Sequence, residues 1–183
     1  MHFTFTDYNL PVLQNAVLPN LLLAFARAVG SELFNNPLAD ISPGSCGDLE
    51  ITPTFTAMLL DRLRKIDLHL TFISGSWMPS DAFLELIPSK PKLNTLVLAS
   101  ETIYSPKALA DFAAVLAGIL RVVLVGKAII AAKRIYFGVG GSVDAFKVEC
   151  ARHGAIATEI DGHGIDVGDD AGVRRCILEV QMA

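Results

Sequence analysis

Two segments of this chain place polar, aromatic and glycine residues directly after apolar stretches that have the composition of buried strands. Residues 100–104, Ser-Glu-Thr-Ile-Tyr, follow the apolar residues 93–99. Residues 136–141, Tyr-Phe-Gly-Val-Gly-Gly, end a second apolar stretch, which we expect to begin as a strand at residues 121–125. In open α/β sheets, ligands bind beyond the carboxyl ends of the strands. The sequence therefore predicts a functional site formed by these two segments.

The first segment crowds four polar side chains onto the end of a strand that should otherwise be buried. Burying such groups without partners costs free energy, so we expect them to face a cleft or a ligand. The structural alternative is a cap for the helix expected to begin at Pro106, and that alternative explains Ser105 but not Glu101. The four side chains are those of Ser100, Glu101, Thr102 and Tyr104.

The second segment combines aromatic side chains with three glycines that allow a substrate to approach the backbone closely. It also suggests an alternative, the dinucleotide fingerprint of a nucleotide-dependent oxidoreductase, because it lies between a strand and a helix with acidic residues about 20 positions further on. Against that alternative, Val143 occupies the third glycine position, and the motif comes late in the chain. The candidate substrate-binding residues are Tyr136, Phe137, Gly138, Gly140 and Gly141.

Asp7, Tyr8 and Asn9 follow a short strand expected at residues 3–6. A carboxylate at a strand end can accept hydrogen bonds from both hydroxyls of a ribose, and the adjacent aromatic ring can cover an adenine. The alternative is a plain turn, because Asp and Asn favour turns through their own backbone hydrogen bonds.

Trp77 is the one tryptophan of the chain and follows Ser-Gly-Ser, including Ser76, at the end of a strand expected at residues 68–73. Small residues let a flat ligand approach, and the indole offers a large face for stacking. The alternative is a tryptophan that packs in the core.

Composition excludes several classes of protein. Apolar residues make up 52% and charged residues 19% of the 183 residues, which indicates strands buried on both faces. The most apolar region, residues 108–132, is interrupted by charges, so we expect no membrane partner. Three cysteines without CxxC spacing and four scattered histidines favour a reducing compartment and no metal site. A net charge of −4 without a basic tract argues against nucleic-acid binding, and we interpret Arg134 as a surface charge.

Strands alternate with helices, which predicts an α/β fold. The last two strands have no helix between them and should pair antiparallel, so we expect a mostly parallel sheet that ends in an antiparallel hairpin. The expected helices are residues 11–29 with a kink at Pro19, 54–65 with Thr54 as the N-cap, 79–87, one from Pro106, and 143–152; the last strands are residues 155–160 and 173–181.

Taken together, these segments resemble the eukaryotic protein-histidine N-methyltransferases, a branch of the seven-β-strand enzymes that depend on S-adenosylmethionine. The resemblance follows the family's order and spans nearly the whole chain as one domain, residues 1–183. The matching strings are Asp7-Tyr8-Asn9 with Val17-Leu18-Pro19-Asn20, Ser74-Gly75-Ser76-Trp77, Ser100-Glu101-Thr102-Ile103-Tyr104, and residues 132–141.

The resemblance implies a Rossmann-like seven-strand sheet, a histidine of a large-subunit ribosomal protein as the substrate, a monomer, and a location in cytoplasm and nucleus. It also implies roles for the candidate residues. Asp7, Tyr8, Asn9, Ser76, Trp77 and Ser100 would bind the cofactor, Glu101, Thr102 and Tyr104 would border the site of methyl transfer, and Tyr136, Phe137, Gly138, Gly140 and Gly141 would hold the target histidine.

Two departures from the family pattern shape the expectations. Only six residues precede Asp7, so a first strand and a glycine-rich loop for the methionine part of the cofactor have no counterpart. We therefore expect an N-terminally truncated sheet and keep a second hypothesis, a non-catalytic remnant that binds a protein without methylating it. Residues 125–131 resemble an insertion, which would either extend the next strand or bulge from it.

Overall fold

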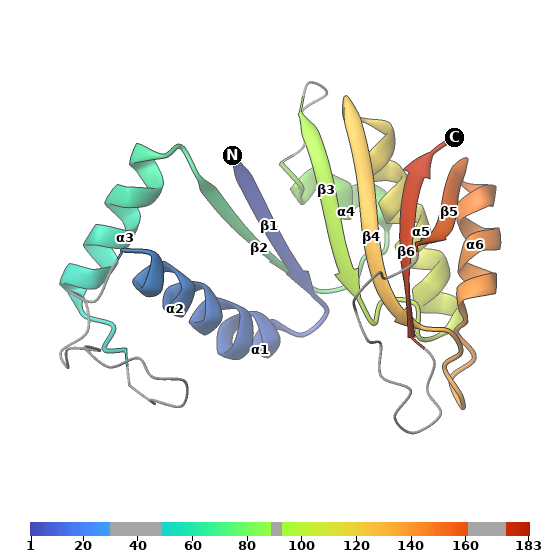
Figure 1. Cartoon of the computed structure of the whole chain (residues 1–183), viewed down its shortest axis with the longest axis horizontal. Helices are drawn as coiled ribbons and strands as arrows, with labels where there is room; N and C mark the ends of the chain where they lie inside the picture. Colours follow the sequence, from blue (N-terminus) through green and yellow to red (C-terminus); the bar gives the residue numbers. More distant parts are fainter. Residues whose placement is uncertain (30–48, 89–92, 161–174) are drawn as a thin grey trace. The chain divides into compact units, whose positions relative to one another are not determined.

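The computed structural model describes residues 1–29, 49–88, 93–160 and 175–183, and within them the chain is an α/β protein (Figure 1). The chain divides into two compact units, unit 1 over Met1–Gly75 and unit 2 over Ser76–Ala183. The single domain over residues 1–183 stays a prediction. The described strands form a two-stranded and a four-stranded sheet. No helix among the described residues has both the length and the apolar character to cross a membrane.

Unit 1 is built around two parallel strands, β1 (His2–Asp7) and β2 (His69–Ser74). Their register runs from His2 opposite His69 to Asp7 opposite Ser74, so both strands end at the same edge. The apolar side chains of Leu13, Ala26, Phe55 and Ile73 are buried in this unit. The helical segments between the strands are α1 (Leu10–Val12), the π-helix η1 (Leu13–Val17), α2 (Leu18–Val29) and α3 (Pro53–Lys65).

Pro19, expected to kink or restart the helix, lies in the first turn of α2, and a π-helical turn directly precedes that helix. Proline has no N–H to donate, and its ring crowds the carbonyl four residues back. The chain widens by one residue there, and Leu18 donates its N–H to the carbonyl of Leu13, five residues earlier. Such a turn relieves the crowding without ending the helix.

The N-cap predicted at Thr54 is wrong. Helix α3 begins at Pro53, and the hydroxyl of Thr52 accepts the N–H of Phe55 over 3.1 Å. Proline favours the first helical position because its missing N–H has no helical partner there. The cap therefore has to precede the proline. Of the loop expected at residues 35–54, residues 35–48 lie outside the described residues.

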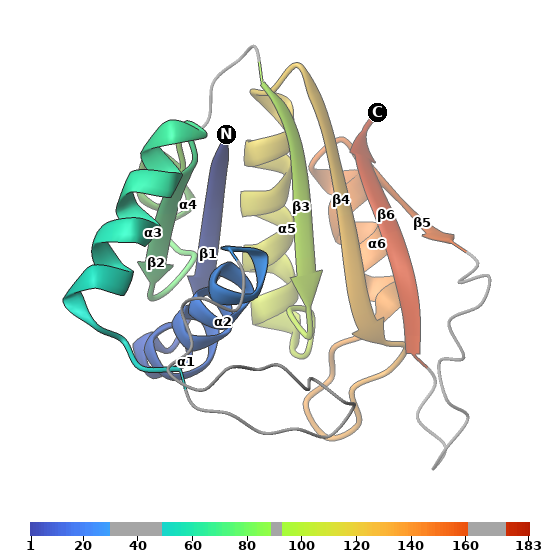
Figure 2. The same ribbon diagram turned by 60° about the vertical axis from the view of Figure 1, so that its left-hand side comes forward.

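Unit 2 holds the four-stranded sheet in the order β3-β4-β6-β5 (Figure 2). β3 and β4 are parallel, and β6 is antiparallel to both β4 and β5, which confirms the expected C-terminal hairpin. Helices α5 and α6 pack on one face of the sheet (Figures 1 and 2). The bounds are β3 (Asn94–Ser100), β4 (Val125–Lys133), β5 (Ala155–Ile160), β6 (Arg175–Met182), α4 (Ser80–Leu86), α5 (Pro106–Arg121) and α6 (Val143–Arg152).

Residues 125–131, expected either to extend the next strand or to bulge from it, extend it as the regular body of β4. They pair one to one with β3, from Asn94 opposite Val125 to Ser100 opposite Ala131. The predicted strand start at residues 121–125 is wrong, because Arg121 ends α5. The alternation of the strand explains this pairing: Ala128 and Ile130 face the core and are fully buried. An in-register β4 brings its end beside the end of β3.

The core of unit 2 lies between this sheet and α5 and α6. Phe146 of α6 is fully buried and stacks on Phe112 of α5 with 5.9 Å between the ring centroids. Ile103, which follows β3, is also fully buried in this core. The segment after β3 is thereby anchored by an apolar side chain placed between polar neighbours. On the opposite face of the sheet, Leu98 is 72% exposed.

Candidate functional site

The structure brings together the two segments that follow β3 and β4. Glu101 donates its N–H to the carbonyl of Ala131 over 3.1 Å, which extends the pairing of the strands by one residue. Further out, Gly141 donates its N–H to the carbonyl of Tyr104 over 3.1 Å. Residues 100–104 and 136–141 therefore form one continuous surface at the strand ends, as the sequence predicts.

The three glycines of the second segment serve different purposes. Gly138 and Gly140 have φ of +81° and +85°, which favours glycine over residues with a side chain. A Cβ on Gly141 would lie 2.1 Å from the carbonyl oxygen of Ile103. The close backbone approach at Gly141 is thus to the neighbouring segment of the protein. Gly138 leaves open space around its Cα.

Glu101 lies at the centre of the site in an unusual conformation. Its φ is +55°, the left-handed region, and its side chain is exposed. Such a backbone costs free energy in a residue with a side chain, and functional sites are where it often persists. The turn directs the chain away from the sheet straight after Ser100. It leaves a carboxylate open to solvent beside the ends of two strands.

Tyr136, in the second segment, lies close enough to Glu101 for its carboxylate to act on the phenol. The Tyr136 side chain is buried, and its hydroxyl accepts the N–H of Lys133 over 3.2 Å. Burial raises the pKa of this phenol, and the charge of Glu101 and a hydrogen bond with it raise the pKa further. The Lys133 ammonium lies 5.7 Å from the centre of the ring. Tyr136 therefore stays neutral and can donate a hydrogen bond to the Glu101 carboxylate.

The hydroxyl of Thr102 is buried without a hydrogen-bond partner among the described residues. An unpaired buried hydroxyl costs on the order of 1–3 kcal/mol, so it is a place where a ligand atom or water is favoured. Ser100, two residues earlier, is exposed on the sheet face opposite α5. It borders a hollow of about 310 Å³ whose lining residues are Leu98, Ala99, Ser100, Ile129, Ala131 and Ile177.

Four apolar or aromatic side chains project into solvent from the two segments and from the residue directly before the second one. Phe137 is 81% exposed, and the others are about half exposed. Exposed aromatic side chains gathered at one place favour binding of another protein or of a ligand. We call this surface the aromatic rim; it consists of Tyr104, Ile135, Phe137 and Val139.

In unit 1, Asp7 forms a turn, which was the structural alternative to ribose binding at this residue. Its Oδ1 accepts the N–H of Asn9 over 2.7 Å, which closes a turn directly after β1. The other carboxylate oxygen has no partner among the described residues, so it is available to a ligand. Tyr8 between them is 72% exposed. Turn formation and ribose binding are therefore compatible at Asp7.

Trp77 packs against the core with part of its side chain and leaves another part exposed. Its ring lies 5.1 Å from the ring of Phe112 and packs against the core of unit 2. The side chain is only partly buried, and thus part of the indole faces outward. Ser76 accepts the N–H of Met78 over 3.1 Å. The structure favours the core reading for one side of the indole.

The geometry argues against the dinucleotide alternative. A pyrophosphate would need free N–H groups in the glycine-rich loop. Instead, Val139 and Gly140 donate their N–H groups to the carbonyl of Tyr136, and Gly141 donates to Tyr104. The hydroxyl of Ser142 caps α6 by accepting the N–H of Ala145. Three of the loop N–H groups that a phosphate could use are therefore already bonded within the protein.

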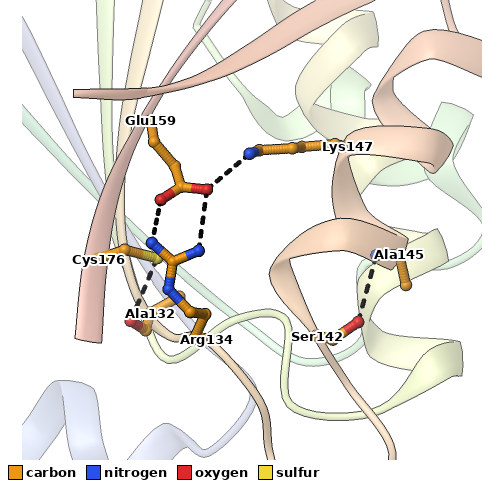
Figure 3. Close-up of polar contacts among 7 residues, drawn as sticks. All are labelled: Ala132, Arg134, Ser142, Ala145, Lys147, Glu159 and Cys176. Atoms are coloured by element: carbon orange, nitrogen blue, oxygen red, sulfur yellow. Dashed lines mark hydrogen bonds and ion pairs between the residues drawn. The ribbon is translucent and has the colours of Figure 1, made fainter. Parts of the chain in front are cut away.

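Sequence reasoning missed an ion-pair network at the base of the second segment. Arg134, interpreted as a plain surface charge, binds Glu159 of β5, and Lys147 of α6 binds the same carboxylate (Figure 3). No local sequence pattern links these residues, because Arg134 and Glu159 are 25 positions apart. Among the described residues, no group of three or more His, Cys, Asp or Glu side chains could hold a metal ion.

No family model matches the chain. It is similar to "Histidine protein methyltransferase 1" of Saccharomyces cerevisiae, with 34% identity over 155 residues, which are 80% of this chain and 40% of the yeast protein. It is also similar to the protein of the same name from Schizosaccharomyces pombe, with 32% identity over 142 residues, 78% of this chain and 38% of that protein. The chain thus spans about 40% of the length of these curated relatives.

Proposed function

This chain belongs to the histidine protein methyltransferase family, and we propose that it transfers a methyl group to a histidine side chain of a protein. The observation that carries the proposal is the placement of Glu101. Its carboxylate stands exposed at the joined ends of β3 and β4, close enough to the buried, neutral Tyr136 to raise its pKa, and on the same joined segments that carry Tyr104 and Phe137 of the aromatic rim. A protein segment bound on the rim would bring a side chain to that carboxylate.

The cofactor in this proposal is S-adenosylmethionine, which supplies a methyl group on a positively charged sulfur. Unpaired polar atoms support the fit: the buried hydroxyl of Thr102, the exposed Ser100, and one free carboxylate oxygen of Asp7. By the family resemblance, Asp7 would bind the ribose and Tyr8 the adenine, with Asn9 closing the turn. The same resemblance assigns Ser76, Trp77 and Ser100 to cofactor binding.

Glu101 would act on the target histidine by selecting its tautomer. In a neutral imidazole one ring nitrogen carries a proton and the other has a free lone pair. If the Glu101 carboxylate accepts a hydrogen bond from the ring N–H, the lone pair of the other nitrogen would be left free to accept the methyl group. The same carboxylate then offsets the positive charge of the methylated ring. Thr102 and Tyr104 would border the transferred group, and positioning would supply most of the rate.

Further parts of the proposal concern the substrate and the whole protein. The substrate would be a histidine of a large-subunit ribosomal protein, bound by Tyr136, Phe137 and the glycines Gly138, Gly140 and Gly141. We also propose a monomer in cytoplasm and nucleus that binds neither nucleic acid nor a membrane, and a Rossmann-like seven-strand sheet for the complete family fold. The α/β topology with its antiparallel C-terminal hairpin supports that fold.

Calorimetric titration of the purified chain with S-adenosylhomocysteine tests the proposal first. We expect micromolar binding that weakens on Asp7→Ala and is unchanged on Glu179→Gln, a substitution on β6 away from the site. Methyl transfer from radiolabelled S-adenosylmethionine to ribosomal proteins would then identify the substrate. A folded chain that binds a ribosomal protein but not the cofactor would overturn methyl transfer in favour of a binding protein without catalytic activity.

A further inference from the structure

The loop that carries Tyr136 and Phe137 is closed at its base by backbone contacts. Arg134 follows β4 directly, and its carbonyl accepts the N–H of Val143, the first residue of α6, over 3.1 Å. One step further out, Ile135 and Ser142 form an isolated antiparallel bridge. Residues 134–142 therefore form a short hairpin-like loop whose orientation is set where it leaves the sheet, at Arg134.

The side chain of Arg134 ties this base to a different strand. Its Nη1 donates to Oε1 of Glu159 over 3.2 Å, and its Nη2 donates to Oε2 of the same carboxylate (Figure 3). This two-pronged contact matches the planar guanidinium to the planar carboxylate and fixes the direction of both side chains. Glu159 lies on β5, a strand with no other role in the site.

Lys147 completes the network from the helix that follows the loop. Its Nζ donates to Oε1 of Glu159 over 2.7 Å (Figure 3). Glu159 thus joins the residue before the loop, through Arg134, to the helix after it, through Lys147. Its side chain is 28% exposed and that of Lys147 is 33% exposed. Partial shielding and two cationic partners distinguish this network from an isolated surface pair.

Tyr136 is buried in the core of unit 2, but the outer part of the loop has little side-chain packing to hold it. Phe137 is 81% exposed and Val139 is 52% exposed. Inside the loop, Tyr136 donates its N–H to Gly141, and Gly140 donates to Tyr136. These bonds set the shape of the loop but not its angle to the sheet. The angle depends on the buried Tyr136 ring, on the contact with Tyr104 and on the Arg134 base.

We propose that Glu159 is a positioning residue for substrate binding, which acts through Arg134 to fix the loop that presents Tyr136 and Phe137. The inference rests on the proposed function for the identity of the substrate, a protein segment that carries the target histidine. The claim that Glu159 fixes the orientation of the loop does not depend on the proposed function. Glu159 touches neither the rim nor Glu101, so its effect on the substrate is indirect.

Glu159→Gln is the variant that tests this inference, because it keeps the size of the side chain and removes its charge. Glu179→Gln is a matched control. Glu179 lies on the neighbouring strand β6 and is 27% exposed, and its carboxylate is 2.8 Å from the Lys127 ammonium. This ion pair does not involve the loop. Arg134→Lys is a milder second variant that keeps a positive charge but loses the two-pronged contact. Arg134→Lys replaces Glu159→Gln as the test variant if Glu159→Gln prevents the chain from folding.

Hydrogen exchange of the loop amides gives a readout that needs no activity. We expect exchange at Val139, Gly140 and Gly141 to be about three- to tenfold faster in Glu159→Gln and Arg134→Lys than in the unmodified chain. Exchange in α5 should stay the same in all variants, and Glu179→Gln should leave the loop unchanged. Unchanged loop exchange in both network variants would overturn the inference.

Kinetics supply the second readout. Both network variants should raise KM for the protein substrate by about fivefold, with kcat at saturation and the KM for S-adenosylmethionine unchanged. A loss of kcat with no change in KM would also overturn the positioning role. If the unmodified chain transfers no methyl group, the proposed function fails by itself, and the exchange measurement still decides whether Glu159 holds the loop.

Discussion

Gly141 donates its backbone N–H to the carbonyl of Tyr104 over 3.1 Å, and a Cβ on Gly141 would lie 2.6 Å from that same oxygen. No residue other than glycine fits at this distance without movement of the backbone. The contact is what places the segment after β4 against the segment after β3. The aromatic rim and the carboxylate of Glu101 thereby share one surface.

Gly141→Ala should therefore destabilise unit 2 by about 3 kcal/mol, because the added methyl group meets backbone atoms that cannot rotate away. Gly138→Ala is the control. Its φ of +81° is unfavourable for alanine, but nothing lies within 4 Å of the added atom, so we expect a cost of about 1 kcal/mol. Urea unfolding followed by circular dichroism measures both. Equal losses would mean that the close approach to Tyr104 is not what requires glycine.

The hydroxyl of Thr102 leads to a prediction in which stability and binding change in opposite directions. Thr102→Val replaces a buried hydroxyl that has no partner among the described residues. The chain without ligand should keep its stability or gain up to about 1 kcal/mol, while ligand binding should weaken about fivefold. Thermal unfolding and calorimetric titration with S-adenosylhomocysteine give the two values.

Thr158→Val on β5 is the control for that substitution, because Thr158 is exposed and lies outside the site. It should leave the affinity unchanged. If Thr102→Val also binds the cofactor product and the protein substrate normally, the hydroxyl has no role in ligand binding.

Much of unit 2 could be predicted because its boundaries depend on local signals. Helix α6 and strand β5 occur at the predicted residues: Ser142 caps the helix, and Gly154 with a φ of +74° ends it before the strand begins. Ser105 caps α5 by accepting the N–H of Ala108, as expected. These signals lie within a few residues of the boundary that they set.

What could not be predicted depends on partners that are distant in sequence. Whether residues 125–131 extend a strand or bulge from it could not be predicted, because their pairing with β3, about 30 positions away, determines the length of β4. The binding of Arg134 to Glu159 could not be predicted for the same reason, because the two residues are 25 positions apart. The role of Gly141 could not be predicted either. A glycine required for close approach to a substrate and a glycine required for close approach to Ile103 look the same in a sequence. Only the backbone position distinguishes them.

Glu101→Gln should lower turnover far more than cofactor affinity, because Gln offers a neutral oxygen that neither fixes the imidazole tautomer nor offsets the positive charge of the product. We expect kcat to fall about 100-fold and the Kd for S-adenosylhomocysteine to stay within about twofold. Steady-state methyl transfer and calorimetry measure these two quantities. Equal losses of both would assign Glu101 to the cofactor instead.

Phe137→Ala tests the aromatic rim. The side chain is 81% exposed, so its removal should change the free energy of unfolding by less than about 0.5 kcal/mol. If the rim binds the protein substrate, KM for that substrate should rise about tenfold, as truncation of an aromatic anchor does at interfaces. Ile156→Ala removes a side chain of β5 that is 59% exposed and serves as the control. An unchanged KM in Phe137→Ala would place the substrate elsewhere.

The ion pairs of Glu159 and Glu179 predict how stability depends on pH. Hydrogen bonds from Lys147 and then Arg134 hold the pKa of Glu159 below its ordinary value of 4.5, and a hydrogen bond from Lys127 lowers the pKa of Glu179. A carboxylate with a lowered pKa in the folded state binds fewer protons there than in the unfolded chain. Its stabilisation is therefore complete above pH 4.5 and is lost as the pH falls through the lowered pKa.

Glu159→Gln and Glu179→Gln should accordingly lower the urea midpoint of unfolding by an amount that is constant from about pH 6 to pH 8. Below the ordinary glutamate pKa the difference from the unmodified chain should shrink and then vanish, because the protonated carboxyl no longer attracts Lys147 or Lys127. Urea titrations at a series of pH values measure the difference. A deficit that persists in strong acid would show that packing of the glutamate side chain, and not its charge, stabilises the sheet at these positions.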